Sequence, residues 1–173
     1  MRPAVVLIGP PGAGKTTVGR ILAKRLDLSL RDTDDVVEEM AGKPISDIFI
    51  DDGEAAFRQM EHDAVVDGLT NFDGVLALGG GAVMTPAIAE RLREEAAAGT
   101  VVVFLDVSWR HAAPRVGLNV TRPLLLESPR KKWLELMAKR RTTYEDLATI
   151  TFLTDGKHPQ QIARQLHRQL KED

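Results

Sequence analysis

Cysteine is absent from the 173-residue sequence. This excludes disulfide bonds and thiolate metal sites, and it fits a reducing compartment. Long apolar runs are absent as well. The first run, at residues 4–8, is too short for a signal-peptide core, and no run approaches the ~18 residues of a membrane-spanning helix. We therefore expect a cytoplasmic protein with no membrane partner.

The sequence also has no excess of basic residues, since its formal net charge is -2. A strongly basic patch is the usual mark of a general nucleic-acid binder, so no nucleic-acid partner is expected. The charges are nevertheless uneven, with acids dominating residues 31–63 and bases dominating residues 110–141. Most of these charges are expected on solvated helix faces, but a basic C-terminal half is also what a polyphosphate site requires.

Short apolar runs, expected to be strands, alternate with longer amphipathic stretches, expected to be helices. The expected strands are residues 5–8, 28–30, 75–78, 101–105 and 150–153. The expected helices begin near residue 15 and cover residues 54–69, 86–98, 130–147 and 159–170, with Thr85 as N-cap of the third. This alternation predicts one α/β domain, residues 1–173, with a mostly parallel sheet and helices on both faces. Residues 116–129 form the least regular stretch, a loop candidate.

Residues 9–16, GPPGAGKT, match the phosphate-binding pattern G-x-x-x-x-G-K-[ST]. The match follows an expected strand and precedes an expected helix, which is the context that the pattern needs. Its glycines allow backbone N–H groups to approach phosphates, and the helix N-terminus adds its positive dipole end. Lys15 would reach the β- and γ-phosphates, and Thr16 would bind Mg²⁺. The pattern thus predicts a nucleotide site, but it serves kinases, GTPases and motor proteins alike.

Three further features concern an acceptor. Asp32 and Asp34, two residues apart on an extended segment, would project to the same side, one toward a Mg²⁺-bound water and one toward an acceptor hydroxyl. The alternative for this pair is a helix N-cap followed by an acidic first turn. Glycines 79–81 end the third expected strand, where parallel sheets bind ligands, although a flexible turn would look the same. Arginine suits carboxylates and phosphates, but spacing alone singles out no arginine.

Together these segments resemble the shikimate kinase family. The matching pieces are GPPGAGKTT at 9–17, DTD at 32–34, IFIDDGEAAFRQME at 48–61, LALGGGAV at 76–83, TRPLL at 121–125 and LMAKRRTTY at 136–144. The resemblance implies a three-layer α/β/α P-loop kinase fold with a five-stranded parallel sheet of order 2-3-1-4-5. It also implies a cytoplasmic monomer that uses ATP and Mg²⁺ to convert shikimate to 3-phosphoshikimate, in the shikimate pathway of aromatic amino acid biosynthesis.

The resemblance assigns roles to individual residues as well. Asp34 would contact the attacking hydroxyl, as general base or orienting group, while Lys15 and Arg122 would neutralise charge on the transferred group. The shikimate-binding residues, within about 33–61 and beyond it, would be Asp34, Arg58, Gly80, Gly81 and Arg140, with Phe49 and Phe57 as an apolar wall and Glu61 orienting Arg58. The nucleotide-binding residues would be Gly12, Ala13, Gly14, Lys15, Thr16, Thr17, Arg115, Arg122 and Pro159. Thr16 and Asp32 would hold Mg²⁺, and residues 116–129 would form a mobile lid carrying Arg122.

Two other functions remain open at this point. A related small-molecule kinase, acting on gluconate or a nucleoside monophosphate, would keep the phosphate site but change the acceptor set. A nucleotide-dependent switch or binding module would leave Asp34 and Arg58 unused. The acceptor set suits a carboxylate-bearing polyol best. Trp109 and Trp133 have no role that the sequence supports, so packing is the expectation for both.

Overall fold

The computed structural model describes residues 1–116 and 128–172. The first half contains β1 (Val5–Ile8), α1 (Lys15–Leu26), β2 (Ser29–Asp32), α2 (Thr33–Ala41), α3 (Ile45–Asp51), α4 (Glu54–Asn71) and β3 (Gly74–Ala77). The second half contains η1 (Ala82–Met84), α5 (Pro86–Ala97), β4 (Val101–Asp106), α6 (Trp109–Val116), α7 (Pro129–Leu147), β5 (Ile150–Leu153) and α8 (Pro159–Glu172). Within these ranges, no helix has an apolar stretch long enough to cross a membrane.

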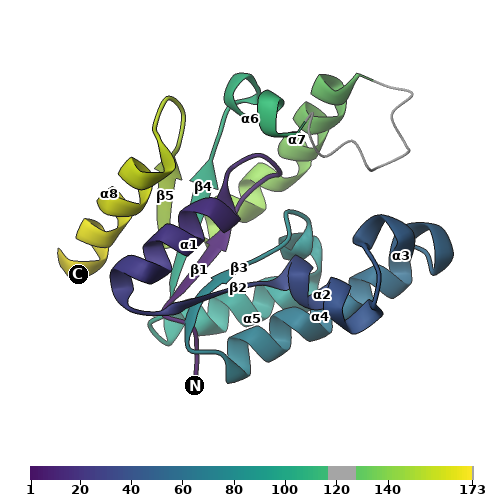
Figure 1. Cartoon of the computed structure of the whole chain (residues 1–173), viewed down its shortest axis with the longest axis horizontal. Coiled ribbons are helices and arrows are strands. Elements are labelled where there is room, and N and C mark those ends of the chain that lie inside the picture. The colour runs from purple at the N-terminus through teal and green to yellow at the C-terminus, as the bar shows by residue number, and fades with distance from the viewer. Residues whose placement is uncertain (117–127, 173) are drawn as a thin grey trace.

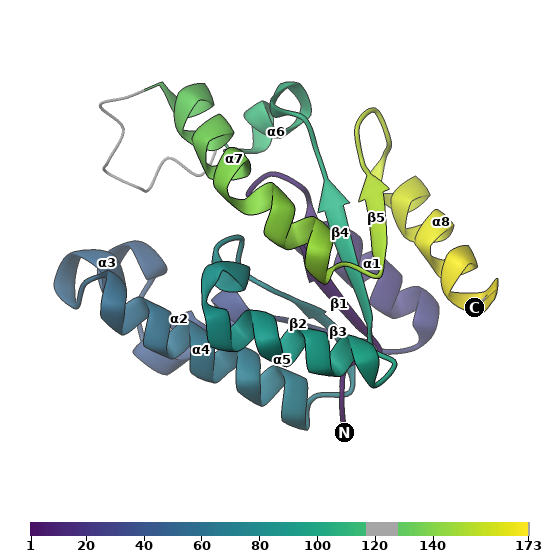
Figure 2. The same ribbon diagram turned by 180° about the vertical axis from the view of Figure 1, so that it is seen from behind.

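The five strands form one parallel sheet in the order β2-β3-β1-β4-β5, which confirms the predicted fold. Val5 of β1 pairs with Val75 of β3 on one side and with Val101 of β4 on the other. Helices α1 and α8 cover one face, and α4, α5 and α7 cover the opposite face (Figures 1 and 2). Because β1 and β3 are buried on both faces, their sequences are continuous apolar runs rather than alternating ones.

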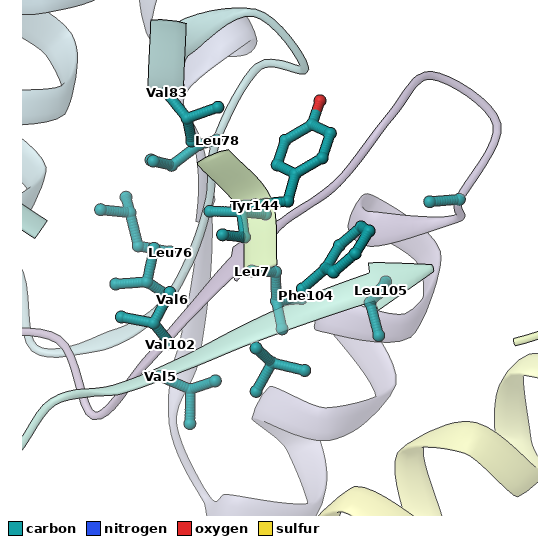
Figure 3. Close-up of a cluster of buried hydrophobic side chains, with 14 of the residues drawn as sticks. Val5, Val6, Leu7, Leu76, Leu78, Val83, Val102, Phe104, Leu105 and Tyr144 are labelled. Atoms are coloured by element: carbon teal, nitrogen blue, oxygen red, sulfur yellow. The ribbon is translucent and has the colours of Figure 1, made fainter. Parts of the chain in front are cut away.

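The described residues form two hydrophobic clusters of unequal size. The large one surrounds the central strands and the helices on both faces, and Figure 3 shows part of it, including Leu7, Leu76 and Phe104. The small cluster contains Val37 of α2, Ile48 of α3, and Phe57 and Ala64 of α4. It lies where α2, α3 and the start of α4 extend away from the sheet (Figure 1). The ends of the sheet strands and this small cluster together frame the candidate site.

The predicted extended segment ends at Asp32, and from Thr33 onward the alternative interpretation, a helix N-cap followed by an acidic first turn, is right. Asp32 is the last residue of β2 and the N-cap of α2, and Asp34 is already in the first turn of that helix. The Asp34 N–H donates a 2.9 Å hydrogen bond to Oδ1 of Asp32. An N-cap carboxylate satisfies a helix N–H that would otherwise lack a partner, and this favours helix over a longer strand. The backbone is therefore extended at Asp32 and helical at Asp34.

Other boundaries differ only slightly from the predicted ones. β2 begins and ends later than expected, at Ser29–Asp32, and α4 continues to Asn71. Thr85 is the N-cap of α5 and Pro86 its first residue, although the Thr85 side chain makes no capping hydrogen bond. Of the expected lid, residues 116–129, only the two ends belong to the described residues. Arg122 lies outside them.

Candidate active site

The phosphate-binding loop, residues 9–16, connects β1 to α1 and needs its glycines for both conformation and space. Gly12 and Gly14 have positive φ angles of 84° and 83°, which residues with a Cβ atom rarely adopt. A Cβ on Gly12 would lie 2.9 Å from the Cβ of Ala112 in α6, and one on Gly9 would lie 2.6 Å from the carbonyl oxygen of Leu105. The loop therefore fits closely beneath α6, with the N-terminus of α1 directed at it.

Lys15 contacts this loop and lies near the carboxylates of Asp32 and Asp34. Its Nζ donates hydrogen bonds to the carbonyl oxygens of Gly9, at 2.8 Å, and Pro10, at 3.1 Å. Burial of the ammonium lowers the pKa of Lys15 to about 8, against the attraction of Asp34 and Asp32, which raises it. The lysine ammonium is thus held where the phosphate loop meets the first turn of α2.

Thr16 and Asp32 offer two oxygen ligands on the same side of the loop. The Thr16 hydroxyl donates a 2.5 Å hydrogen bond to Oδ2 of Asp32. Among the described residues, no group of three or more histidine, aspartate or glutamate side chains could enclose a metal ion. Mg²⁺ needs no such cage, because it binds one or two protein oxygens and completes its shell with waters and substrate phosphates. The hydroxyl–carboxylate pair therefore fits this ion.

Arg58 and Arg140 come from different helices, α4 and α7, and meet at the glycine segment, residues 79–81, which follows β3. A Cβ on Gly81 would lie 2.9 Å from both terminal nitrogens of Arg58 and 3.1 Å from Nη2 of Arg140. Arg58 Nη1 also donates a 2.7 Å bond to Oε1 of Glu61, whose side chain is almost completely buried. Two guanidinium groups beside a backbone without side chains form a natural receptor for a carboxylate.

Asp34 faces the same glycine segment. A Cβ on Gly79 would lie 2.6 Å from Oδ1 of Asp34 and 3.0 Å from Oε2 of Glu61. The Gly79 N–H donates to the hydroxyl of the fully buried Thr33, at 3.2 Å. This bond joins the start of α2 to the glycine segment, so Asp34 is held close to Arg58 and Arg140.

The other residues expected at the site lie in the small cluster, at the phosphate loop and α1, and at the start of α8. Phe57 is buried in the small cluster, and half-buried Phe49 lies beside it with ring centroids 4.7 Å apart. Arg115, on α6, donates a 3.0 Å bond to the carbonyl oxygen of Gly12, so it contacts the phosphate loop directly. Pro159 is the first residue of α8. Within the loop and α1, Ala13 is buried and Thr17 is exposed.

Two residues of α7 were missed as functional candidates by sequence reasoning. The Trp133 Nε1–H donates a 2.9 Å hydrogen bond to the carbonyl oxygen of Pro11, and its ring contacts Trp109 at a centroid distance of 5.7 Å. The Tyr144 hydroxyl donates a 2.5 Å bond to the carbonyl oxygen of Gly80. Packing was expected for both tryptophans and is found. The sequence signals for Tyr144 were its place at the end of the matching piece at 136–144 and its position four residues after Arg140, one helical turn away.

Comparisons with known proteins agree with this geometry. The family model described as Shikimate kinase matches residues 11–171. A shikimate kinase of Salinispora arenicola is 52% identical over 94% of this chain and 95% of its own, and that of Streptomyces coelicolor is 47% identical over 94% and 92%. The solved structure of a shikimate kinase from Acinetobacter baumannii in complex with shikimate has a TM-score of 0.90 and 31% identity, covering 99% of this chain and 94% of its own.

These matches extend through nearly all of the chain, and the Acinetobacter structure shares its fold. The matched range includes residues 11–16 of the phosphate loop, the first turn of α2, the glycine segment and α7. The chain therefore belongs to the shikimate kinase family.

Proposed function

We propose that this protein transfers the γ-phosphoryl group of ATP to a hydroxyl group of shikimate, giving 3-phosphoshikimate and ADP. The observation that supports this best is the meeting of Arg58 and Arg140 at Gly81, a carboxylate receptor that opens beside Asp34 and the phosphate loop. Shikimate carries one carboxylate and several hydroxyls. A kinase for an uncharged polyol would have no use for two converging guanidinium groups.

On the donor side, the loop N–H groups and the N-terminus of α1 would bind the phosphates. Lys15 would leave the carbonyl oxygens of Gly9 and Pro10, its present partners, to bind the β- and γ-phosphates. Thr16 and Asp32 would hold Mg²⁺, Asp32 through a water molecule, and the ion when bound supplies charge neutralisation. Arg115 and Pro159 would contact the adenine, and Arg122, which lies outside the described residues, would act on the γ-phosphate.

On the acceptor side, Arg58 and Arg140 would bind the carboxylate together with the backbone of Gly80 and Gly81. Glu61 would keep the Arg58 guanidinium in position through their 2.7 Å bond. Asp34 would orient the attacking hydroxyl and accept its proton as the new oxygen–phosphorus bond forms and the bond to the ADP oxygen breaks. This division suits phosphoryl transfer, in which positioning and charge stabilisation do most of the catalysis.

An ADP-release assay tests the proposal, with ATP and Mg²⁺ present and shikimate, gluconate or a nucleoside monophosphate added in separate reactions. Of the three acceptors, we expect only shikimate to give strong ADP release. This release should be lost when EDTA removes Mg²⁺. Release with gluconate or the nucleotide but not with shikimate would reject the acceptor assignment and leave the phosphate site intact. Size-exclusion chromatography of the same sample tests the proposed monomer.

A further inference from the structure

Helix α7 contacts both ligand-binding loops through buried aromatic side chains that end in a polar atom. Only 4% of Trp133 and none of Tyr144 is exposed to solvent. The two residues are eleven positions apart on Pro129–Leu147, about 16 Å along the axis at 1.5 Å per residue. Figure 2 shows α7 lying along the face of the sheet near the ends of β1 and β4. One rigid helix therefore reaches the phosphate loop near its start and the glycine segment near its end.

The Trp133 bond controls a peptide group of the phosphate loop. Its indole N–H can only donate, and it donates to the Pro11 carbonyl oxygen at 2.9 Å. That carbonyl and the N–H of Gly12 belong to one planar peptide unit and point in opposite directions. Holding the Pro11 oxygen therefore sets the direction of the Gly12 N–H, which belongs to the phosphate-binding motif.

The Tyr144 hydrogen bond sets the direction of a peptide group in the glycine segment in the same way. The phenol donates to the Gly80 carbonyl oxygen at 2.5 Å, and the peptide unit that contains this oxygen also contains the N–H of Gly81. The ring stacks on Phe104 of β4 at a centroid distance of 4.9 Å, and Figure 3 shows both side chains in the large cluster. Burial raises the pKa of Tyr144, partly opposed by Arg140, so the phenol stays a donor.

We propose that Trp133 and Tyr144 are positioning residues that give α7 control over both ligand loops. Trp133 orients the Pro11–Gly12 peptide for the nucleotide phosphates, and Tyr144 orients the Gly80–Gly81 peptide, together with the neighbouring Arg140, for the acceptor carboxylate. The acceptor half rests on the function proposed above. The nucleotide half needs only the phosphate loop.

Two variants test this assignment: Tyr144→Phe removes only the hydroxyl donor, and Trp133→Phe removes the N–H donor together with part of the buried ring. Trp133→Phe is expected to raise the KM for ATP and the Kd for ADP about three- to tenfold, as for the loss of one neutral hydrogen bond, with the KM for shikimate unchanged. Tyr144→Phe is expected to raise the KM for shikimate three- to tenfold and to leave ADP binding unchanged. A role in folding alone would not separate the two substrates in this way.

Trp109→Phe is the matched control, because it alters the same aromatic contact but keeps the Trp133 N–H. It is expected to leave both KM values within twofold, whatever its melting temperature. The proposal is overturned if the two variants shift both KM values together, or if they lower only the melting temperature. If the wild-type protein does not phosphorylate shikimate, the proposed function fails, yet ADP binding by Trp133→Phe still tests the nucleotide half. If it does, and Tyr144→Phe has an unchanged shikimate KM, only the present inference fails.

Discussion

The donor and acceptor sites are built in different ways. The phosphate loop is one continuous segment, residues 9–16, whose function depends on backbone groups and on the space left by glycines. The acceptor site is assembled from four distant segments, namely the first turn of α2, the start of α4, the glycine segment after β3, and α7. Its function depends mainly on charged side chains. Local conformation therefore shapes most of the donor site, with Trp133 of α7 as a long-range contact, whereas the acceptor site depends on how the helices pack.

The two sites also differ in what supports them. The phosphate loop lies against the large hydrophobic cluster, in which Ala13 and Val18 take part. The acceptor residues Asp34 and Arg58 are on helices that pack around the small cluster of Val37, Ile48, Phe57 and Ala64. Regions with few buried apolar contacts open locally more readily than the main core. We therefore expect the acceptor side to be the softer of the two.

The largest effect is expected from Asp34→Asn, which removes the proton acceptor but keeps the shape of the side chain. Loss of a positioned base typically costs about 10²–10⁴-fold, so kcat should fall within that range. ADP binding should change by less than threefold, because the phosphate loop is untouched. Steady-state kinetics and calorimetric titration with ADP measure the two quantities.

Asp35→Asn is the matched control for this variant. Asp35 is the next residue of α2 and is exposed, so its charge is similar but its position is not. Its kcat should stay within twofold of the wild-type value. Equal losses in the two variants would mean that acidic charge on α2, and not the position of Asp34, supports transfer.

The next largest effect is expected from Arg140→Lys, compared with the same change at Arg141. Arg140 lies at the glycine segment, whereas Arg141 makes bonds of 2.9 and 3.1 Å to the Asp106 carboxylate. Lysine lacks the planar fork that binds a carboxylate at two points. Arg140→Lys should raise the KM for shikimate about 10- to 100-fold, and Arg141→Lys should leave it unchanged while lowering the melting temperature. If Arg141→Lys raises this KM and Arg140→Lys does not, the shikimate carboxylate binds Arg141 and our assignment is wrong.

The donor site could be predicted from the sequence because its pattern is local. Eight consecutive residues, a preceding strand and a following helix specify a phosphate loop, and the structure has all three. The strand order 2-3-1-4-5 is different, since periodicity shows that strands alternate with helices but does not order them. That order came from the family resemblance and is confirmed.

The acceptor site could not be predicted in the same way. Neighbouring residues on a helix point about 100° apart, so whether Arg140 or Arg141 faces the glycines depends on how α7 packs. The bond from Tyr144 to Gly80 joins residues 64 positions apart, and no local spacing reveals it. The same is true of the one donor-site contact from α7, the bond from Trp133 to Pro11 over 122 positions. The extended geometry expected for both aspartates ends at Asp32, because Asp32 caps α2 by accepting a hydrogen bond from the Asp34 N–H, and this favours a helix over a longer strand.

A smaller effect concerns the pH dependence of the donor site. The pKa of Lys15 is lowered to about 8 by burial, so its ammonium is charged below pH 8 and loses its proton as the pH rises through that value. Bound phosphate favours the charged form, and the affinity for ADP should therefore fall above pH 8, by at most about tenfold per pH unit. Titrations with ADP between pH 7 and 9.5 measure this. An affinity that stays constant over the whole range would contradict the lowered pKa.

The smallest effect is expected from Ile→Val, made once in each hydrophobic cluster. Ile48 in the small cluster and Ile88 in the large one are both fully buried, and Ile→Val removes one methylene group from either. Each variant should lose about 1 kcal/mol of stability, or about 2–4 °C in melting temperature. Only Ile48→Val should also raise the KM for shikimate, by about twofold, because α2 and α4 pack on Ile48 and carry Asp34 and Arg58. If Ile88→Val raises that KM equally, the two clusters respond as one unit, and the acceptor site draws its support from the whole core.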